Sequence, residues 1–307
     1  MMNISVVMTT YNGARKLLGQ LISLRDQTRK PDEVLIFDDC SDDQTVEIIQ
    51  NFIYENHLYE WTLIQNERNK GKRKNYADAL NTARGALLFL CEQDGEWNLD
   101  RIEKMAAVME EREEIMVLAS SYDVRFENKT GQLRHRKPKP YGDEKLMQVK
   151  PDGKTFEPLF PGFTYVLRKE MVPLFRKVWE PSDAYDRVIW QSALLMNGLY
   201  VLNEKNLVQV RYKTVPDTEH ADLSRAEVIS YRRKLAERMR QRLEVTENAQ
   251  WLNGYIDTAK LREEALLNRD LKQLYGLSKS ALYMPSGYAW MEDMLDALRG
   301  GLKKSVS

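Results

Sequence analysis

The chain has 307 residues with 46 basic and 46 acidic side chains, so its formal net charge is zero at pH 7. A dedicated nucleic-acid-binding protein normally carries a basic excess, so no nucleic-acid partner is expected. The longest apolar run, Ala86 to Cys91, is far shorter than the ~20 residues that span a bilayer. With 43% hydrophobic residues the composition also excludes a disordered chain. A globular protein without membrane-spanning helices is predicted.

The first 120 residues alternate between short apolar or β-branched runs and longer helical patterns. Strands are predicted at Ile4–Thr9, Glu33–Asp38, Trp61–Gln65, Ala86–Cys91 and Ile115–Ser120. Helices are predicted between them at Ala14–Gln27, Asp43–Asn56, Arg73–Ala83 and Asp100–Glu111. This alternation is typical of βαβ units and a parallel sheet. The segment Ser41-Asp42-Asp43-Gln44 further predicts a capping box at the start of the second helix.

Residues 123–161 are rich in Gly, Pro, Lys and Arg, which predicts loops with a β excursion. Regular patterns return as strands at Thr164–Leu167, Tyr200–Asn203 and Leu207–Tyr212, with helices near Lys169–Lys177 and Asp183–Asn197. From Asp222 onward the chain is predicted to be almost entirely helical.

The N-terminal residues have no charged region, long apolar stretch and small-residue cleavage site in succession, so no secretory signal is expected. The chain is therefore expected in the cytoplasm. Two cysteines, Cys40 and Cys91, are too few for a disulfide scaffold, and three scattered histidines offer no zinc spacing. We expect both cysteines to be reduced and buried.

Three polar clusters follow predicted parallel strands: Thr9-Thr10-Tyr11-Asn12-Gly13, Asp38-Asp39-Cys40-Ser41-Asp42 and Glu92-Gln93-Asp94-Gly95-Glu96-Trp97. In an open α/β sheet, ligands bind outside the carboxyl ends of the strands, so we expect the three clusters to form one site. The first strand is not followed by Gly-x-Gly-x-x-Gly, which argues against a dinucleotide-binding oxidoreductase. The phosphate-binding loop of ATPases is also missing.

A family resemblance rests on four motifs in a specific order and spacing. They are Thr10-Tyr11-Asn12-Gly13, Asp38-Asp39-Cys40-Ser41-Asp42-Asp43, Asn69-Lys70-Gly71 with Asn75, and Glu92-Gln93-Asp94 with Trp97. Together they resemble the nucleotide-sugar domain of family 2 glycosyltransferases over about residues 1–215. The Gln-Asp pair and the Trp after it are similar to the rhamnosyltransferase-like branch, whose members extend cell-surface polysaccharides.

This resemblance implies the GT-A fold, an α/β fold with a Rossmann-like, mostly parallel sheet flanked by helices, here followed by a helical C-terminal extension. Residues 1–220 would form the nucleotide-sugar-binding and catalytic domain, with the acceptor side at about 121–220, and residues 221–307 the helical region. The implied activity is inverting transfer of a sugar from a UDP- or dTDP-sugar to a hydroxyl group. The acceptor would be a cell-surface polysaccharide or a lipid-linked glycan precursor.

The resemblance also implies which residues bind the nucleotide. Asp38 or Asp39 would accept the N3–H of a uracil or thymine base, since a carboxylate is the natural partner of an imide donor. The alternative for both aspartates is a cap at the start of the following helix. Thr9 and Tyr11 would line the same pocket. Lys72 and Arg73, at the head of the third helix, would reach the nucleotide; their alternative is simple solvation.

Glu92-Gln93-Asp94 occupies the position of the Asp-x-Asp motif of the family. Glu92 and Gln93 would lie on the nucleotide side, and Asp94 would hold a divalent cation, Mg²⁺ or Mn²⁺, that offsets the charge of the diphosphate. Glu92 departs from the usual Asp. Read without this resemblance, a Glu-x-Asp loop is a solvated turn.

For the reaction, a carboxylate must deprotonate the acceptor hydroxyl, and Asp186 is the candidate, with Asp183 as the second choice. The alternative for Asp186 is a first-turn helix carboxylate favoured by the helix dipole. The family often places His or Glu before this acid, where this chain has Tyr185. Arg211, Lys213 and Trp97 are assigned to the diphosphate or acceptor side. Lys213 stands where related enzymes often have a His that completes the metal site, so it would neutralise diphosphate as a point charge instead.

Two alternative functions come from different classes. One is a sugar-1-phosphate nucleotidyltransferase, which should carry a Gly-rich, Arg-containing loop after the first strand; Thr10-Tyr11-Asn12-Gly13-Ala14 is not such a loop. The other is a catalytically decayed copy that serves as a partner subunit. The departures from the family pattern at Glu92, Tyr185 and Lys213 favour this alternative.

The segment Arg225 to Arg242 holds seven basic and two acidic side chains and predicts an amphipathic basic helix. It either packs on the core with a solvated outer face, which we favour, or docks at an anionic membrane surface. Docking would place the chain at the inner face of the cell membrane, peripherally. Further aromatic residues toward the C-terminus support homo-oligomerisation through these helices as a hypothesis.

Overall fold

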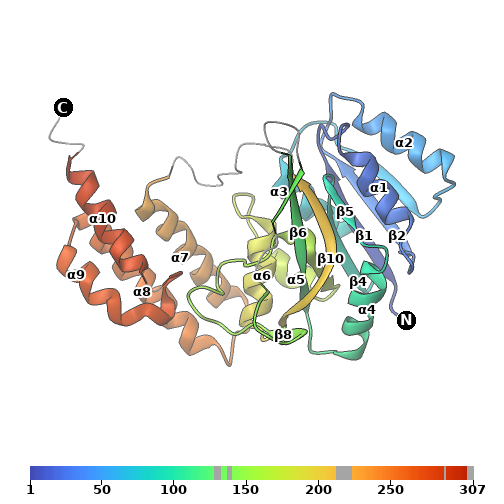
Figure 1. Ribbon diagram of the computed structural model, residues 1–307. Helices are drawn as coiled ribbons and strands as arrows, with labels where there is room; N and C mark the ends of the chain where they lie inside the picture. Colours follow the sequence, from blue (N-terminus) through green and yellow to red (C-terminus); the bar gives the residue numbers. More distant parts are fainter. Residues whose placement is uncertain (128–132, 137–139, 212–222, 287, 303–307) are drawn as a thin grey trace. The chain divides into compact units, whose positions relative to one another are not determined.

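The protein is described by a computed structural model that covers residues 1–127, 133–136, 140–211, 223–286 and 288–302 (Figure 1). The chain divides into two compact units. The first comprises Met1–Val149, Phe160–Ile189 and Gly198–Thr214, and the second comprises Lys150–Leu159, Trp190–Asn197 and Val215–Ser307. The boundary between residues 220 and 221 that the sequence predicts falls outside the described residues and stays a prediction.

The described strands are β1 Ile4–Thr10, β2 Glu33–Asp38, β3 Trp61–Gln65, β4 Leu87–Glu92, β5 Gly95–Trp97, β6 Val117–Glu127, β7 Leu133–Arg136, β8 Leu146–Gln148, β9 Tyr165–Arg168 and β10 Leu199–Arg211. The described α-helices are α1 Leu17–Arg25, α2 Thr45–Glu55, α3 Lys72–Thr82, α4 Arg101–Glu111, α5 Met171–Val178, α6 Tyr185–Leu195, α7 Arg225–Arg242, α8 Ala249–Asn268, α9 Leu271–Gly276 and α10 Ala289–Leu302. Two 3₁₀ helices are η1 Gly162–Thr164 and η2 Leu277–Tyr283.

The strands of the first unit form one mixed sheet in the order β3-β2-β1-β4-β9-β6-β10-β5, with β7 beside β6 and β8 beside β10. Strands β1 to β4 are parallel, as the sequence predicts, and β1 lies between β2 and β4. Strand β9 runs antiparallel between β4 and β6. The α/β fold class with a helical C-terminal extension is therefore confirmed.

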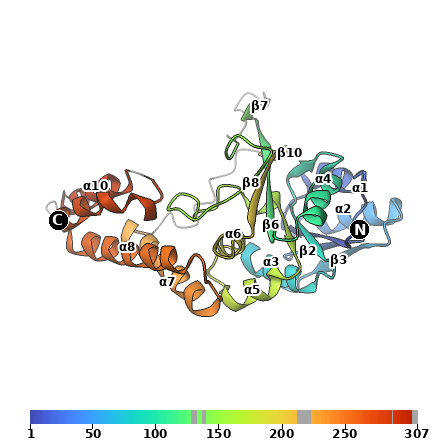
Figure 2. The same ribbon diagram turned by 90° about the horizontal axis from the view of Figure 1, so that it is seen from below.

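Helices cover both faces of this sheet, which explains why its central strands are continuous apolar runs. All seven residues of β1 are buried. Helices α1, α2 and α4 lie over one face and α3 and α5 over the other (Figures 1 and 2). The core between the layers includes Val6, Leu21 and Phe89, all fully buried. Burial on both sides fixes the carboxyl ends of β1, β2 and β4 at one edge of the sheet.

The main difference from the predicted elements concerns β10. The sequence predicts two strands, Tyr200–Asn203 and Leu207–Tyr212, but the structure has one strand that pairs with β6 through two shifts of register around Lys205. A β-bulge allows the strand to stay paired through an irregular segment. This segment interrupts the apolar alternation in the sequence, although the strand itself continues. Strand β5, which pairs with β10, was also not predicted.

The second unit contains helices α7 to α10, which share a small apolar core around Ile229, Ala265 and Leu274. Helix α7 begins with a capping box in which Ser224 and Glu227 exchange hydrogen bonds. Its basic side chains pair with acids of the same unit, for example Arg233 with Glu263 at 2.8 Å. Docking of this basic helix at a membrane surface stays a prediction.

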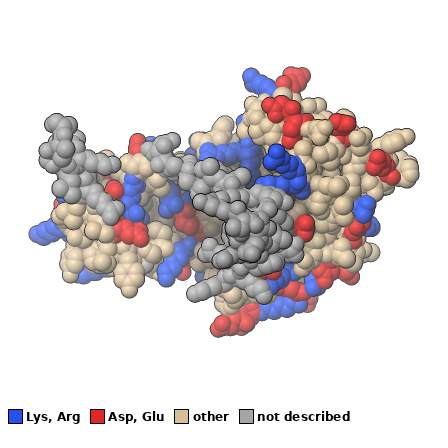
Figure 3. Space-filling model, turned by 45° about the horizontal axis from the view of Figure 1, so that its top comes forward, with Lys and Arg blue, Asp and Glu red and all other residues tan. Residues whose placement is uncertain are grey.

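Among the described residues, the structure contains no helix that combines the length and the apolar character needed to cross a membrane. Basic and acidic side chains are mixed over much of the face shown in Figure 3. This mixture agrees with the zero formal charge of the chain.

Candidate functional site

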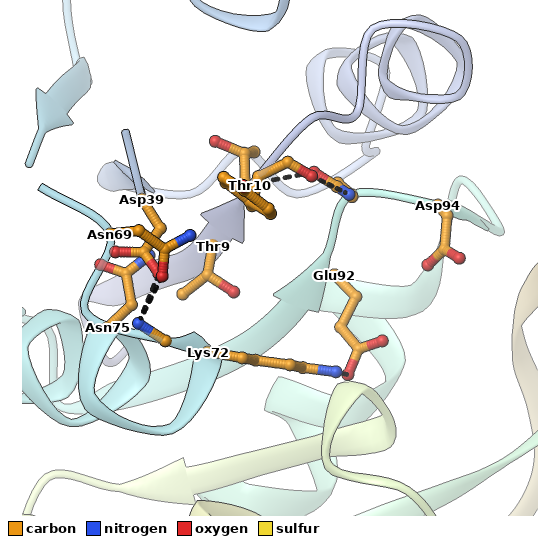
Figure 4. A pocket seen from close by; sticks show the side chains of 11 residues that line it. Thr9, Thr10, Asp39, Asn69, Lys72, Asn75, Glu92 and Asp94 are labelled. Atoms are coloured by element: carbon orange, nitrogen blue, oxygen red, sulfur yellow. Dashed lines mark hydrogen bonds and ion pairs between the residues drawn. The ribbon is translucent and has the colours of Figure 1, made fainter. Parts of the chain in front are cut away.

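The polar loops that follow β1, β2 and β4 meet at one cavity of about 430 Å³, as expected for the carboxyl edge of a parallel sheet. Figure 4 shows Asp39 and Asn69 at one end of this cavity, Asp94 at the other, and Glu92 between them. The cavity is lined by Thr9, Thr10, Tyr11, Asp39, Asn69, Gly71, Lys72, Asn75, Glu92, Gln93 and Asp94.

Asp39 forms the wall at the first end and holds the loop that leads into α3. It is only 2% exposed. Its Oδ1 accepts the backbone N–H of Lys70 at 2.8 Å and the side-chain amide of Asn66 at 3.0 Å. Its Oδ2 accepts the N–H of Gly71 at 2.8 Å. Gly71 has a φ of 83°, a conformation that glycine adopts without strain, so the sequence places glycine where the loop turns toward this carboxylate.

Asp38 lies behind the wall and does not line the cavity. It is 0% exposed, and its Oδ2 accepts hydrogen bonds from Thr10 Oγ1 at 2.8 Å and Ser41 Oγ at 2.6 Å. It therefore ties the end of β1 to the loop after β2. The predicted capping box is wrong, because Ser41 is engaged by Asp38 and α2 begins at Thr45, whose N–H donates to Asp43 at 2.9 Å.

Gln93 joins two of the three loops. Its Oε1 accepts the backbone N–H of Tyr11 and its Nε2 donates to the carbonyl of Tyr11, both at 2.9 Å. A Cβ at Gly13 would lie 2.3 Å from Gln93 Oε1, so a larger residue there would displace the Gln93 side chain from these hydrogen bonds. The side chain assigned to the nucleotide side therefore already fixes the loop that carries Tyr11, which itself remains half-exposed.

Glu92, at the end of β4, is held by two neighbours on the inner side of the cavity. Its Oε1 is 2.8 Å from Lys72 Nζ, the contact drawn in Figure 4, and 3.4 Å from the hydroxyl of Tyr185. Lys72 is the first residue of α3 and is half-exposed at the cavity wall. Arg73 does not line the cavity; its Nη1 donates to the carbonyl of Ser182 at 2.7 Å.

Asp94 lies at the far end of the cavity with Lys16 3.6 Å from its carboxylate. Among the described residues no group of three His, Cys, Asp or Glu side chains is arranged to hold a metal ion. Mg²⁺ and Mn²⁺ are, however, commonly held by one or two carboxylates together with substrate phosphates. Asp94 and the nearby Glu92 offer such oxygen ligands, so the residues present fit a cation that is shared with a diphosphate.

Trp97, which the sequence assigns to the diphosphate or acceptor side, does not line the cavity. It is 5% exposed, belongs to the apolar core, and its ring lies 4.2 Å from the Arg101 guanidinium carbon. Burial of Arg101 lowers the pKa of its guanidinium to about 9. A large aromatic residue that follows an exposed loop is drawn inward here because β5 pairs with β10 and directs Trp97 toward Phe89.

Asp186 lies in the first turn of α6, and its Oδ1 accepts the N–H of Arg187 at 2.9 Å. It is partly exposed, whereas Asp183 is fully buried and accepts the N–H of Glu180 at 2.8 Å. Asp183 therefore closes the turn before the helix. Of the two candidates for the base, only Asp186 has an accessible side chain.

Two of the predicted residues cannot be placed in the site by their side chains. Arg211 ends β10, and its side chain is not described. Lys213 lies outside the described residues. Both cysteines are free, as predicted; Cys91 is buried, which raises the pKa of its thiol. The prediction that Cys40 is buried is wrong, because the loop after β2 turns there with a φ of 64° and leaves it half-buried.

Several residues of the site were not assigned a role from the sequence. Thr10, Asn69, Gly71 and Asn75 line the cavity although only their motifs were recognised. Lys16 was missed because it lies in the turn after β1, where a lone lysine carries no pattern.

Comparison with known proteins identifies relatives of part of the chain. The family model described as "Glycosyl transferase family 2" matches residues 5–168. TarS of Staphylococcus aureus, a poly(ribitol-phosphate) beta-N-acetylglucosaminyltransferase, is 31% identical over 120 residues, which are 38% of this chain and 21% of TarS. TuaG of Bacillus subtilis, described as a teichuronic acid biosynthesis glycosyltransferase, is 31% identical over 109 residues, which are 36% of this chain and 42% of TuaG. The matches thus span less than half the length of these relatives.

Solved structures extend the likeness in fold to nearly the whole chain. The crystal structure of residues 1–349 of S. aureus TarS with UDP-GlcNAc has a TM-score of 0.64 at 20% identity, covering 96% of this chain and 89% of that one. The mannosyltransferase PcManGT of Pyrobaculum calidifontis with GDP-Man and Mn²⁺ has a TM-score of 0.55 at 16% identity, covering 98% and 86%. Since the family model matches more than half of its residues, the chain belongs to glycosyl transferase family 2.

Proposed function

We propose that this chain transfers a sugar from a UDP- or dTDP-sugar to a hydroxyl of a cell-surface polysaccharide or a lipid-linked glycan precursor, with inversion at the anomeric carbon. The observation that carries the proposal is the order of the carboxylates along the cavity, with Asp39 at one end and Glu92 and Asp94 toward the other. This order matches a nucleoside diphosphate, which has a hydrogen-bonding base at one end and a charged diphosphate at the other.

At the base end, Asp39 is the proposed acceptor of the N3–H of uracil or thymine. Its oxygens already accept three N–H groups from the loop at residues 66–71, which fixes the position of the carboxylate. A carboxylate has about four lone-pair sites, so one can remain for the base. We propose that Asp38 acts from behind this wall by fixing Thr10 rather than by touching the base.

At the diphosphate end, Asp94 and Glu92 are the residues that would hold a divalent cation, Mg²⁺ or Mn²⁺. When bound, the cation would offset the negative charge that develops on the leaving diphosphate. Lys72, Arg211 and Lys213 are proposed to add positive charge to the same region. The Mn²⁺ and GDP-Man named for the PcManGT structure support this arrangement.

For transfer with inversion, a carboxylate must take the proton of the acceptor hydroxyl as the oxygen attacks the anomeric carbon from the side opposite the diphosphate. We propose Asp186 for this role. It lies in the first turn of α6, and its side chain is accessible. The nucleotide diphosphate leaves as the new glycosidic bond forms.

The acceptor class is proposed from the relatives, since TarS and TuaG are both described in terms of cell-wall polymers. Membership of the rhamnosyltransferase-like branch and the homo-oligomer stay proposals. The acceptor side stays proposed at about residues 121–220.

The test is calorimetric titration of the purified chain with UDP, dTDP and GDP, each with Mn²⁺, Mg²⁺ or EDTA, followed by assays of hydrolysis and transfer. UDP or dTDP should bind at least tenfold more tightly than GDP, because the guanine base does not present the same imide edge to Asp39. Asp39→Asn should weaken this binding, while Asp42→Asn, an exposed neighbour outside the cavity lining, serves as the control. Absence of binding to all three nucleotides would contradict the proposal.

A further inference from the structure

Tyr185, the residue before the proposed base, is buried next to Glu92, which lines the cavity. Tyr185 is 4% exposed, and its ring stacks on Tyr76 with centroids 4.0 Å apart and an angle of 17° between the planes. Its hydroxyl donates to Glu92 Oε1 at 3.4 Å. The sequence showed only that Tyr185 departs from the His or Glu of the family.

Helix α3 supports the same contact from the other side. Lys72 binds the same Oε1 of Glu92 at 2.8 Å, and Tyr76, one turn further along α3, carries the stacked ring. Tyr76 is fully buried and its hydroxyl donates to the carbonyl of Cys91, next to Glu92 in β4. One face of α3 therefore touches both Glu92 and the residue next to Asp186.

The start of α6 is packed without spare room. Arg73 of α3 donates to the carbonyl of Ser182 at 2.7 Å, three residues before Tyr185. At Gly162 an added Cβ would lie 2.7 Å from the Tyr185 hydroxyl and 2.8 Å from Asp186 Cβ. Contacts this short allow no side chain at residue 162, so the backbone of η1 packs directly against these two residues.

The Tyr185 phenol is a hydrogen-bond donor that faces the Glu92 carboxylate. A length of 3.4 Å is long for this bond, and such bonds in ligand-free sites often tighten when the substrate binds.

We propose that Tyr185 is a positioning residue, which fixes the Asp186 carboxylate relative to the donor cavity through its hydrogen bond to Glu92 and its stacking on Tyr76. The inference rests on the proposed function, because it assigns Asp186 the role of base. It also gives Tyr185 a use in catalysis, although the sequence counted it among the signs of a decayed enzyme. A misplacement of a reacting group by about 1 Å can cost about 100-fold in rate.

The test compares Tyr185→Phe, which removes only the hydroxyl, with Tyr185→Leu, which also removes the stacking. We expect kcat for sugar transfer to fall about fivefold in Tyr185→Phe and about 100-fold in Tyr185→Leu. The Kd for the nucleotide measured by calorimetry should stay within about twofold, since neither change removes a residue of the cavity lining. Tyr54→Phe, at an exposed tyrosine of α2 outside the cavity lining and outside residues 121–220, is the control and should leave kcat unchanged.

A double variant asks whether Tyr185 acts through Glu92. If it does, Tyr185→Phe should lower kcat by less than twofold when Glu92→Gln is already present, because the two changes remove the same contact. Full additivity of the two losses, or a loss of nucleotide binding in place of a loss of kcat, would overturn the inference. Urea unfolding of every variant identifies any loss that comes from instability alone.

The two proposals fail in different ways. If the wild-type chain binds the nucleotide and transfers sugar while both Tyr185 variants keep the wild-type kcat, only the positioning role is wrong. If the wild-type chain neither binds a nucleotide nor transfers sugar, the proposed function is wrong and the positioning role is overturned with it.

Discussion

Acidic side chains serve different purposes in the two units. In the second unit Asp293 is 0% exposed, and Arg262 donates to its two oxygens at 2.7 and 3.1 Å while Arg225 reaches it from α7. In the first unit Glu92 and Asp94 line an open cavity, each facing a lysine, at 2.8 Å for Lys72 and 3.6 Å for Lys16.

The difference shows that a carboxylate can stabilise the fold in one environment and bind a ligand in another. A buried carboxylate whose oxygens face two guanidinium groups cannot be removed without leaving buried positive charge behind. A cavity carboxylate beside a flexible lysine can exchange that lysine for a ligand at low cost, because the lysine returns to solvent. Stability should therefore depend most on charge in the second unit, and ligand binding on charge in the first.

The strongest test of the comparison is Asp293→Ala. Removing one partner of a buried ion pair typically costs 3–5 kcal/mol, so we expect the free energy of unfolding of the second unit to fall by about 4 kcal/mol. Urea unfolding monitored by tryptophan fluorescence measures this change. Asp296→Ala, at an exposed aspartate of the same helix, should change it by less than about 0.5 kcal/mol. Equal losses in the two variants would show that the buried ion pairs are not special.

The counterpart in the first unit is Asp186→Asn. Loss of a general base should lower kcat by about 1,000-fold, with nucleotide Kd and the free energy of unfolding nearly unchanged. Steady-state transfer assays and calorimetry check these values. Asp183→Asn should behave differently and lower stability, because Asp183 is fully buried and closes the turn before α6. Full activity of Asp186→Asn would remove this residue from the mechanism.

Asp39→Asn should weaken UDP or dTDP binding by about 10- to 150-fold, since a hydrogen bond to a charged group contributes about 1.5–3 kcal/mol. The same change disturbs the loop at residues 66–71, so the N–H groups of Lys70 and Gly71 should exchange faster with deuterium. Hydrogen exchange and calorimetry together separate the two effects. Binding at wild-type strength would place the base elsewhere.

The smallest expected effect concerns Lys16→Met. Because Lys16 pairs with Asp94 in the absence of ligand, its removal should tighten Mn²⁺ binding about two- to threefold, the size of a partly exposed ion pair. Electron paramagnetic resonance of Mn²⁺ titrated into the protein with UDP measures it. Lys30→Met, at an exposed lysine outside the cavity lining, is the control. Weaker Mn²⁺ binding in Lys16→Met would mean that this lysine assists the diphosphate directly.

The sequence predicts the sheet well where the strands are buried on both faces. Glu33–Asp38 has the predicted bounds, because a parallel strand that is buried on both faces is a compact apolar run between polar ends. Trp61–Gln65, a partly buried strand at the edge of the sheet, also has the predicted bounds. The convergence of the loops at residues 9–13, 38–42 and 92–97 follows from the same rule. Strand β10 was divided in two because its bulge around Lys205 interrupts the apolar pattern without ending the pairing.

Amino-acid sequence alone determined the α/β class, the position of the site at one edge of the sheet, and the motifs that placed Asp39, Glu92 and Asp94 there. These features depend on local patterns of burial and on the direction of parallel strands. Tertiary structure decided which of two adjacent aspartates faces the cavity, that Trp97 packs in the core, and that Tyr185 meets Glu92 from 93 residues away. Such contacts depend on the packing of α3 and α6, which no local sequence pattern predicts.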